Sequence, residues 1–336
     1  MAKIILGLGM SHGPQLSTPP EEWGQRVVAD KSETAHPFKE NTYSYDELVE
    51  LRQTENFAAE ITLDRWRQKY TACMASIEEL GSIYKKAQPD VAVIIGNDQN
   101  ELFQSDNNPA FCVFRGAKIA HGPHSKEQLT KMPPGIEISM RGYFPPEDME
   151  HDGEPKLADH IIGSLMAENF DVGTSDVMPT AAARTRGAPH AFGFVYRRIM
   201  KDKVIPNVPL FQNTFFPPNQ PTAQRCFDFG KAVHRAIKSW ESEKTVAVFA
   251  SGGLSHFVID AELDQRILTA MQKNDFADLT AIPETMYQSG TSETKNWIAT
   301  AGIMAESGLS MNIVDYIPCY RSEAGTGTAM AFASWQ

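Results

Sequence analysis

Short apolar segments alternate with longer amphipathic segments along most of this chain, and this alternation limits the folds open to it. Five segments rich in Ile, Val and Phe and bounded by Gly, Pro or Asn have the character of buried β-strands: residues 3–8, 91–95, 204–211, 245–250 and 311–317. Between them, apolar side chains recur on one helical face at residues 63–86, 156–168, 223–239 and 293–306. The pattern predicts an α/β fold with a mostly parallel central sheet and helices on both of its faces.

The chain has no internal repeat and no linker, so we expect one domain over residues 1–336, a length that can bury a large core. Two segments interrupt the alternation. Residues 17–56 are rich in Pro, Glu and Tyr, and residues 121–154 contain PPG, FPPED and several His. Both are insertions longer than ordinary connections, and long loops in compact domains usually carry function or are disordered.

Charge and composition exclude several classes of partner. The net charge is -11 and no run of Lys or Arg is present, which argues against nucleic acid and favours a small-molecule partner. No stretch reaches the ~18 apolar residues of a membrane span. The four cysteines lie far apart without a CxxC pair, which fits a reducing compartment, and the N-terminus lacks the pattern of a signal peptide. We therefore expect a cytoplasmic protein.

Polar turns follow three of the expected strands. GMSHGP places His12 after the first strand, GNDQ places Gln99 after the second, and SGGLSH places His256 after the strand at 245–250. Ligands of open α/β sheets bind beyond the carboxyl ends of the strands, so these turns should converge. RGAPHAFG with His190 and SGTSETKNW with Glu293, each near the start of a helix, are two further polar sites.

Each of these residues also has a structural interpretation. A histidine in a strand-end turn is often a hydrogen-bonded structural residue, and Glu293 can be a first-turn acid favoured by the helix dipole. Three histidines and a glutamate at one pocket instead suit a divalent first-row metal, because two His and one carboxylate leave positions open for substrate and dioxygen. The remaining histidine is then available as an acid or base.

Six motifs follow one another in the order GMSHGP, PDVAVIIGNDQ, HAFGF, FFPPNQPTAQRCFDFG, ASGGLSH and ETKNW. Over nearly the whole chain this set resembles the class III extradiol ring-cleavage dioxygenases, the superfamily of the protocatechuate 4,5-dioxygenase catalytic subunit. The resemblance implies that His12 and Glu293, the latter through its spacing to Trp297, bind Fe(II). It also implies that His256 is the acid/base residue and that His190 lines the substrate pocket. The expected partners are a small aromatic diol and O2, and the expected assembly is a homodimer.

Gln99 departs from this resemblance. Many relatives have N-D-H at this point and use the histidine as the third iron ligand, whereas this chain has N-D-Q. A carboxamide is a weaker and uncharged donor for Fe(II), so three alternatives stay open: Gln99 binds through its oxygen, a loop histidine such as His36 takes the position, or the metal is held loosely or lost. We expect the first, with His12, Gln99 and Glu293 as the metal ligands.

The N-D-Q-x-E pattern and the long N-terminal insertion resemble a branch of 3-O-methylgallate dioxygenases. The function implied is opening of a gallate-type ring, best 3-O-methylgallate, in the catabolism of lignin-derived aromatics. Two other classes compete with it. A non-redox hydrolase would use the same His and Glu around zinc, and a binding member of the superfamily would have lost catalysis, for which Gln99 is the main support. The identity of the metal discriminates among them.

Overall fold

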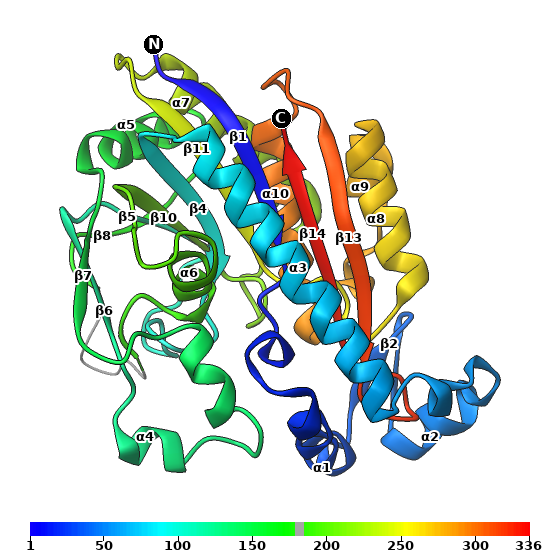
Figure 1. Ribbon diagram of the computed structural model, residues 1–336. Helices are drawn as coiled ribbons and strands as arrows, with labels where there is room; N and C mark the ends of the chain where they lie inside the picture. Colours follow the sequence, from blue (N-terminus) through cyan, green and yellow to red (C-terminus); the bar gives the residue numbers. More distant parts are fainter. Residues whose placement is uncertain (179–184) are drawn as a thin grey trace.

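The computed structural model describes residues 1–178 and 185–336, and within them one large sheet crosses the molecule (Figure 1). Nine strands form it. Its order is β12 (His256–Val258), β14 (Thr326–Trp335), β1 (Lys3–Met10), β11 (Thr245–Ser251), β4 (Val91–Asn97), β10 (Asn207–Gln212), β5 (Phe111–Phe114) and β8 (Gly173–Ser175), and β13 (Met311–Tyr320) pairs with β14.

The centre of the sheet is parallel and buried on both faces. Strands β1, β11, β4 and β10 all run in the same direction. In β4, the side chains of Val91, Val93 and Ile95 enter one apolar core, and those of Ala92 and Ile94 enter the other. Alternate side chains of a strand point to opposite faces, so a strand between two cores must be apolar throughout. The five strands expected from the sequence are confirmed, with ends shifted by a few residues.

The expectation of a mostly parallel sheet is wrong, because the sheet is mixed. Strand β14 runs antiparallel to β1, β12 and β13, and β5 runs antiparallel to β10. A short turn at residues 321–325, with Gly325 at a φ of +71°, joins β13 to β14 as a hairpin, and short turns join only antiparallel strands. The sequence of β14, TGTAMAFASW, lacks the Ile and Val that marked the other strands.

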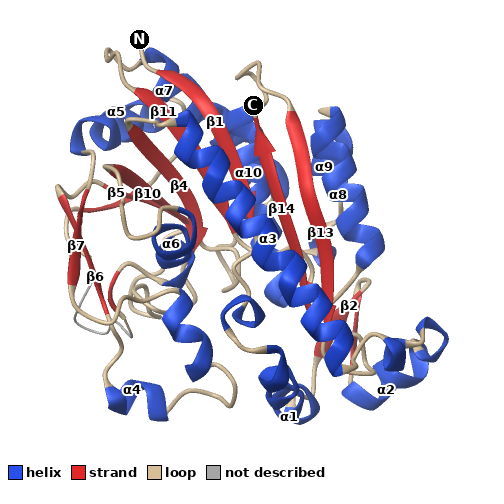
Figure 2. Ribbon diagram, in the orientation of Figure 1, coloured by secondary structure: helices blue, strands red, loops and turns tan. Residues whose placement is uncertain are grey.

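Helices cover both faces of the sheet (Figure 2). On one face, α3 (Leu63–Ala87) lies across β1, β13 and β14, with α6 (His190–Phe194) nearby. The opposite face carries α5 (Pro155–Ala167), α7 (Ala223–Ser239) and α10 (Thr294–Met304), while α8 (Ala261–Lys273) and α9 (Phe276–Ala281) flank β13. The four helices expected from the sequence are confirmed. None of the helices in the described residues is long and apolar enough to cross a membrane.

The two insertions consist of short elements at the same end of the molecule (Figure 1). The first contains α1 (Arg26–Ser32), β2 (His36–Phe38), β3 (Asn41–Tyr43) and α2 (Tyr45–Leu51). The second contains α4 (Lys126–Thr130) and β7 (Met149–Asp152), which pairs with β6 (Lys118–Gly122) and thereby with β9 (Arg186–Gly187). Both insertions lie beside the end of the sheet to which the carboxyl ends of β1, β4 and β11 point.

Candidate active site

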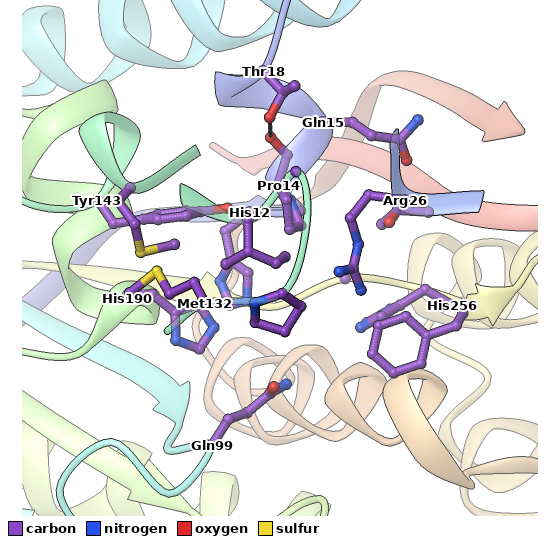
Figure 3. A pocket seen from close by; sticks show the side chains of 18 of the residues that line it. His12, Pro14, Gln15, Thr18, Arg26, Gln99, Met132, Tyr143, His190 and His256 are labelled. Carbon is purple, nitrogen blue, oxygen red and sulfur yellow. Dashed lines mark hydrogen bonds between the residues drawn. The ribbon is translucent and has the colours of Figure 1, made fainter. Parts of the chain in front are cut away.

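A cavity of about 730 Å³ opens beyond the carboxyl ends of β1, β4 and β11 (Figure 3). The strand-end turns contribute His12, Gln99 and His256, and the helix starts contribute His190 and Glu293. The rest of the wall comes largely from the two insertions, between residues 18 and 26 and between residues 124 and 143. The structure therefore brings all five residues singled out from the sequence to one cavity.

The turn after β4 is held by the carboxylate of Asp98. It accepts hydrogen bonds from the backbone N–H groups of Glu101, Leu102 and Phe103 at 3.2, 2.9 and 3.0 Å. Burial, together with the nearby charge of Glu101, raises the pKa of Asp98 to about 7. This compact turn is what places the side chains of Gln99 and Glu101 at the cavity wall.

His12, which is only 3% exposed, is fixed in one tautomer by its partners. The hydroxyl of Ser251 donates its single hydrogen to the Ala191 carbonyl at 2.6 Å, so it must accept from Nδ1 of His12, 2.9 Å away. In neutral His12 the lone pair is therefore on Nε2, which lies 3.1 Å from Oε2 of Glu293. Burial lowers the pKa of His12 even though the charge of Glu293 opposes the change, which favours the neutral ring.

Glu293 stands at the junction of a 3-10 turn and α10, and α10 is tied to the strand ends. The indole of Trp297 donates to the Gly252 carbonyl at 2.8 Å. The amide of Asn296 donates to the side-chain oxygen of Asn97 and to the Ser251 carbonyl, both at 2.9 Å. These bonds join α10 to the ends of β4 and β11 and so fix where the carboxylate of Glu293 lies.

The carboxylate of Glu293 is buried, with 2% of the residue exposed, and it is surrounded by donors. Oε1 accepts from the side-chain amides of Asn97, at 3.0 Å, and Gln99, and Oε2 accepts from the backbone N–H of Gly253 at 3.0 Å. Burial alone would raise the pKa of Glu293, but the adjacent His12 and His256 outweigh it and hold the pKa well below its usual range. The group is a carboxylate at neutral pH.

His256, at the start of β12, also has a defined tautomer. Its Nδ1 lies 2.8 Å from the Leu254 carbonyl, which can only accept, so Nδ1 carries the hydrogen and Nε2 is the free nitrogen. Nε2 lies 3.7 Å from Oε2 of Glu293. A Cβ at Gly290 would come within 2.2 Å of Cδ2 of His256, so the ring fits only against a glycine at this position.

His190 is paired with Glu101, the last residue of the N-D-Q-x-E pattern, to which the sequence analysis gave no role. The carboxylate of Glu101 accepts a hydrogen bond from the backbone N–H of His190 at 3.1 Å. It accepts a second, short hydrogen bond from Nδ1 of the His190 ring. Burial alone would lower the pKa of His190, but the charge and hydrogen bond of Glu101 raise it to about 9. The rings of His190 and His12 lie 4.6 Å apart at nearly right angles. The position of Glu101, two residues after Gln99 in a strand-end turn, was the signal available in the sequence.

The chemistry of this cluster fits a divalent metal ion. In the described part of the chain, His12, His190 and Glu293 each offer a ligand atom within 4.8 Å of the others. Nε2 of His12 is buried and has no hydrogen-bond partner among the residues that the structure describes, and the atom opposite it is a carboxylate oxygen. Two acceptors that face each other with no hydrogen between them are satisfied by a cation, and nitrogen with oxygen donors suits first-row metals.

His36, the loop histidine considered as an alternative ligand, does not line the cavity. It is buried within the N-terminal insertion, where Nε2 lies 2.9 Å from the Asp30 carbonyl. Its ring is thus used in holding β2 against the end of α1.

Comparisons with known proteins identify the family of the chain. The model of the family described as the catalytic LigB subunit of aromatic ring-opening dioxygenase matches residues 63–330. A gallate dioxygenase of Pseudomonas putida (strain KT2440) is 33% identical over 109 residues, which is 32% of this chain. The matched segment covers only 29% of that relative's length.

Proposed function

Because the chain belongs to the family of the catalytic LigB subunit of aromatic ring-opening dioxygenase, we propose that it is an Fe(II)-dependent extradiol dioxygenase. Its substrate is a gallate-type catechol, best 3-O-methylgallate, from lignin-derived aromatics, and it acts as a cytoplasmic homodimer. The observation that carries the proposal is the pair of buried acceptors, Nε2 of His12 and Oε2 of Glu293, 3.1 Å apart at a cavity large enough for a substituted ring.

We assign His12 and Glu293 as two metal ligands and Gln99 as the third. Nε2 of Gln99 donates to Oε1 of Glu293, which places this side chain at the cluster, two residues beyond the end of β4, and Oε1 of Gln99 is the atom that would bind the metal. In its neutral form His190 competes for the same position, since its ligand atom lies in the same cluster and Glu101 orients it as carboxylates orient metal-bound histidines. When bound, Fe(II) supplies a Lewis acid at which a vicinal diol and dioxygen meet.

His256 is the proposed general base and acid. Since the Leu254 carbonyl holds the hydrogen of Nδ1, the free Nε2 is available to take a phenolic proton from a diol in the cavity and to return it later. The glycines around the ring keep it in this orientation during the exchange.

His190 is proposed to position oxygen atoms of the substrate or of dioxygen. With a pKa raised to about 9 by Glu101, its ring is an imidazolium at neutral pH, and Nε2 is then a charged hydrogen-bond donor. A donor of this kind stabilises a deprotonated phenol or a partly reduced oxygen beside it.

Anaerobic reconstitution tests the proposal. The protein is loaded with Fe(II) or Zn(II) and mixed with gallate, 3-O-methylgallate, protocatechuate or catechol, and oxygen uptake is recorded. We expect uptake only with Fe(II), one O2 for each ring opened, and the highest kcat/KM with a gallate-type ring. Hydrolytic turnover with Zn(II), or tight binding without oxygen uptake, would replace the proposal with one of its two rivals.

A further inference from the structure

Among the described residues, the cavity wall carries three Lys or Arg side chains, and two of them are already paired. Arg321 donates to both oxygens of the buried Asp30 at 2.7 Å. Lys131 lies 2.6 Å from Glu127 on an exposed helical turn. Neither group offers an unneutralised charge to a ligand in the cavity.

Arg26 is the third cation and lacks such a partner. Among the described residues, no carboxylate oxygen lies within 4.0 Å of its guanidinium, and the hydrogen bond it makes is to the Pro134 carbonyl at 3.2 Å. Burial, with the charge of Arg321, lowers the pKa of Arg26, yet an arginine stays protonated in proteins. The charge of Asp30 also acts on Arg26, but Arg321 already binds both oxygens of that carboxylate, so the N–H donors of Arg26 that Pro134 does not occupy can bind a ligand anion.

The guanidinium of Arg26 points into the cavity on the side where His256 lies (Figure 3). The negative charges of the wall are the carboxylates of Glu101 and Glu293, which lie beside His190 and His12. A benzoate with its carboxylate beside those two glutamates would face repulsion, whereas the same ring turned around would bring its carboxylate to Arg26 and its hydroxyls to the histidines. Met132, Pro133 and Ile136 also line the cavity and supply apolar surface for the ring.

We propose that Arg26 binds the carboxylate of the substrate, so that the N-terminal insertion selects ring-carboxylated diols over their decarboxylated analogues. The inference rests on the proposed function, which places the ring hydroxyls at the histidines. What it adds rests on the guanidinium of Arg26, which forms no ion pair with the described residues. A planar guanidinium matches a carboxylate with two parallel hydrogen bonds, which gives orientation as well as affinity.

The test compares gallate with pyrogallol, which is the same triol without the carboxylate. Arg26→Gln is expected to lower the affinity for gallate by about 10- to 100-fold, because a charge-assisted pair is lost. Its affinity for pyrogallol should change by less than about twofold. The affinity of Arg26→Lys for gallate should lie between those of the wild type and Arg26→Gln, since lysine keeps the charge but lacks the planar guanidinium with its parallel N–H donors. Lys131→Gln is the matched control, because Lys131 also lines the cavity but is already paired with Glu127. This variant should bind gallate and pyrogallol with unchanged affinity.

Two readouts separate this inference from the proposed function. Anaerobic equilibrium binding of both ligands to the Fe(II)-loaded protein reports on Arg26 whether or not turnover occurs, and oxygen uptake by the wild type reports on the dioxygenase activity. Arg26→Gln could instead lose affinity for gallate and pyrogallol equally and have a lower Tm. That result would mean that Arg26 only links the two insertions through Pro134. Unchanged binding of both ligands would also overturn the inference.

Discussion

The pair of Glu101 and His190 is predicted to make the stability of the metal-free protein depend on pH. Glu101→Gln keeps the shape of the side chain and removes the charge that raises the pKa of His190 from 6.5 to about 9. The side chain of His190 is 16% exposed, so solvent screens this interaction weakly. A rise of this size corresponds to about 3 kcal/mol, at ~1.4 kcal/mol for each pKa unit.

The sign follows from the direction of the shift. A histidine whose pKa is raised in the folded state binds its proton more tightly there than in the unfolded chain. Its contribution to the free energy of unfolding is therefore fully present below pH 6.5 and is lost as the pH rises through about 9. In Glu101→Gln, burial lowers the pKa of His190 and only the charges of Glu293 and Asp98 oppose it, so most of the contribution is lost. The wild type should therefore exceed the variant in unfolding free energy by about 3 kcal/mol at pH 6, and by much less at pH 9.5.

Guanidinium unfolding of chelator-treated protein at pH values from 6 to 9.5 measures this difference. Glu127→Gln is the control, because it breaks an exposed pair with Lys131 that is worth little. Parallel curves of unfolding free energy against pH for the wild type and Glu101→Gln would refute the argument, as they would mean that His190 is not charged by Glu101.

The remaining predictions concern chemistry and ligation. His256→Ala should retain iron and bind substrate while kcat falls by about 100-fold or more, and loss of iron would make His256 a ligand instead. In Fe(II) titrations, Gln99→Ala should weaken affinity and Gln99→His should retain or tighten it, whereas His36→Ala should have no effect, since His36 bonds to Asp30 within the insertion. An unchanged affinity in Gln99→Ala beside a large loss in His190→Ala would assign the third position to His190.

Much of the fold could be predicted because local patterns carry it. Strand β4 is buried on both faces and is therefore apolar at every position, which makes it visible in the sequence. Strand β14 is equally buried, but half of its residues are Ala, Gly or Ser, which do not mark a strand by type. Its antiparallel pairing with β13 and β1 is also why the expected parallel sheet turned out to be mixed.

The candidate site was predictable where polar residues follow strands or begin helices. The role of Glu101 was not predicted because it depends on His190, which is far along the chain and meets it only after folding. Arg26 could not be identified for a similar reason. Nothing in the sequence of the N-terminal insertion marks which of its side chains faces the cavity, since that depends on how α1 packs against the second insertion at Pro134.

An anaerobic Fe(II) titration of the wild type, His12→Ala and Glu293→Ala tests the central claim most directly, because it measures the cation that the two facing acceptors require. We predict one Fe(II) per chain in the wild type and a loss of affinity of at least about 100-fold in each variant, more than the loss of an outer partner of a ligand would cause. Stoichiometric iron bound with wild-type affinity in either variant would show that the buried pair of His12 and Glu293 is not a metal site.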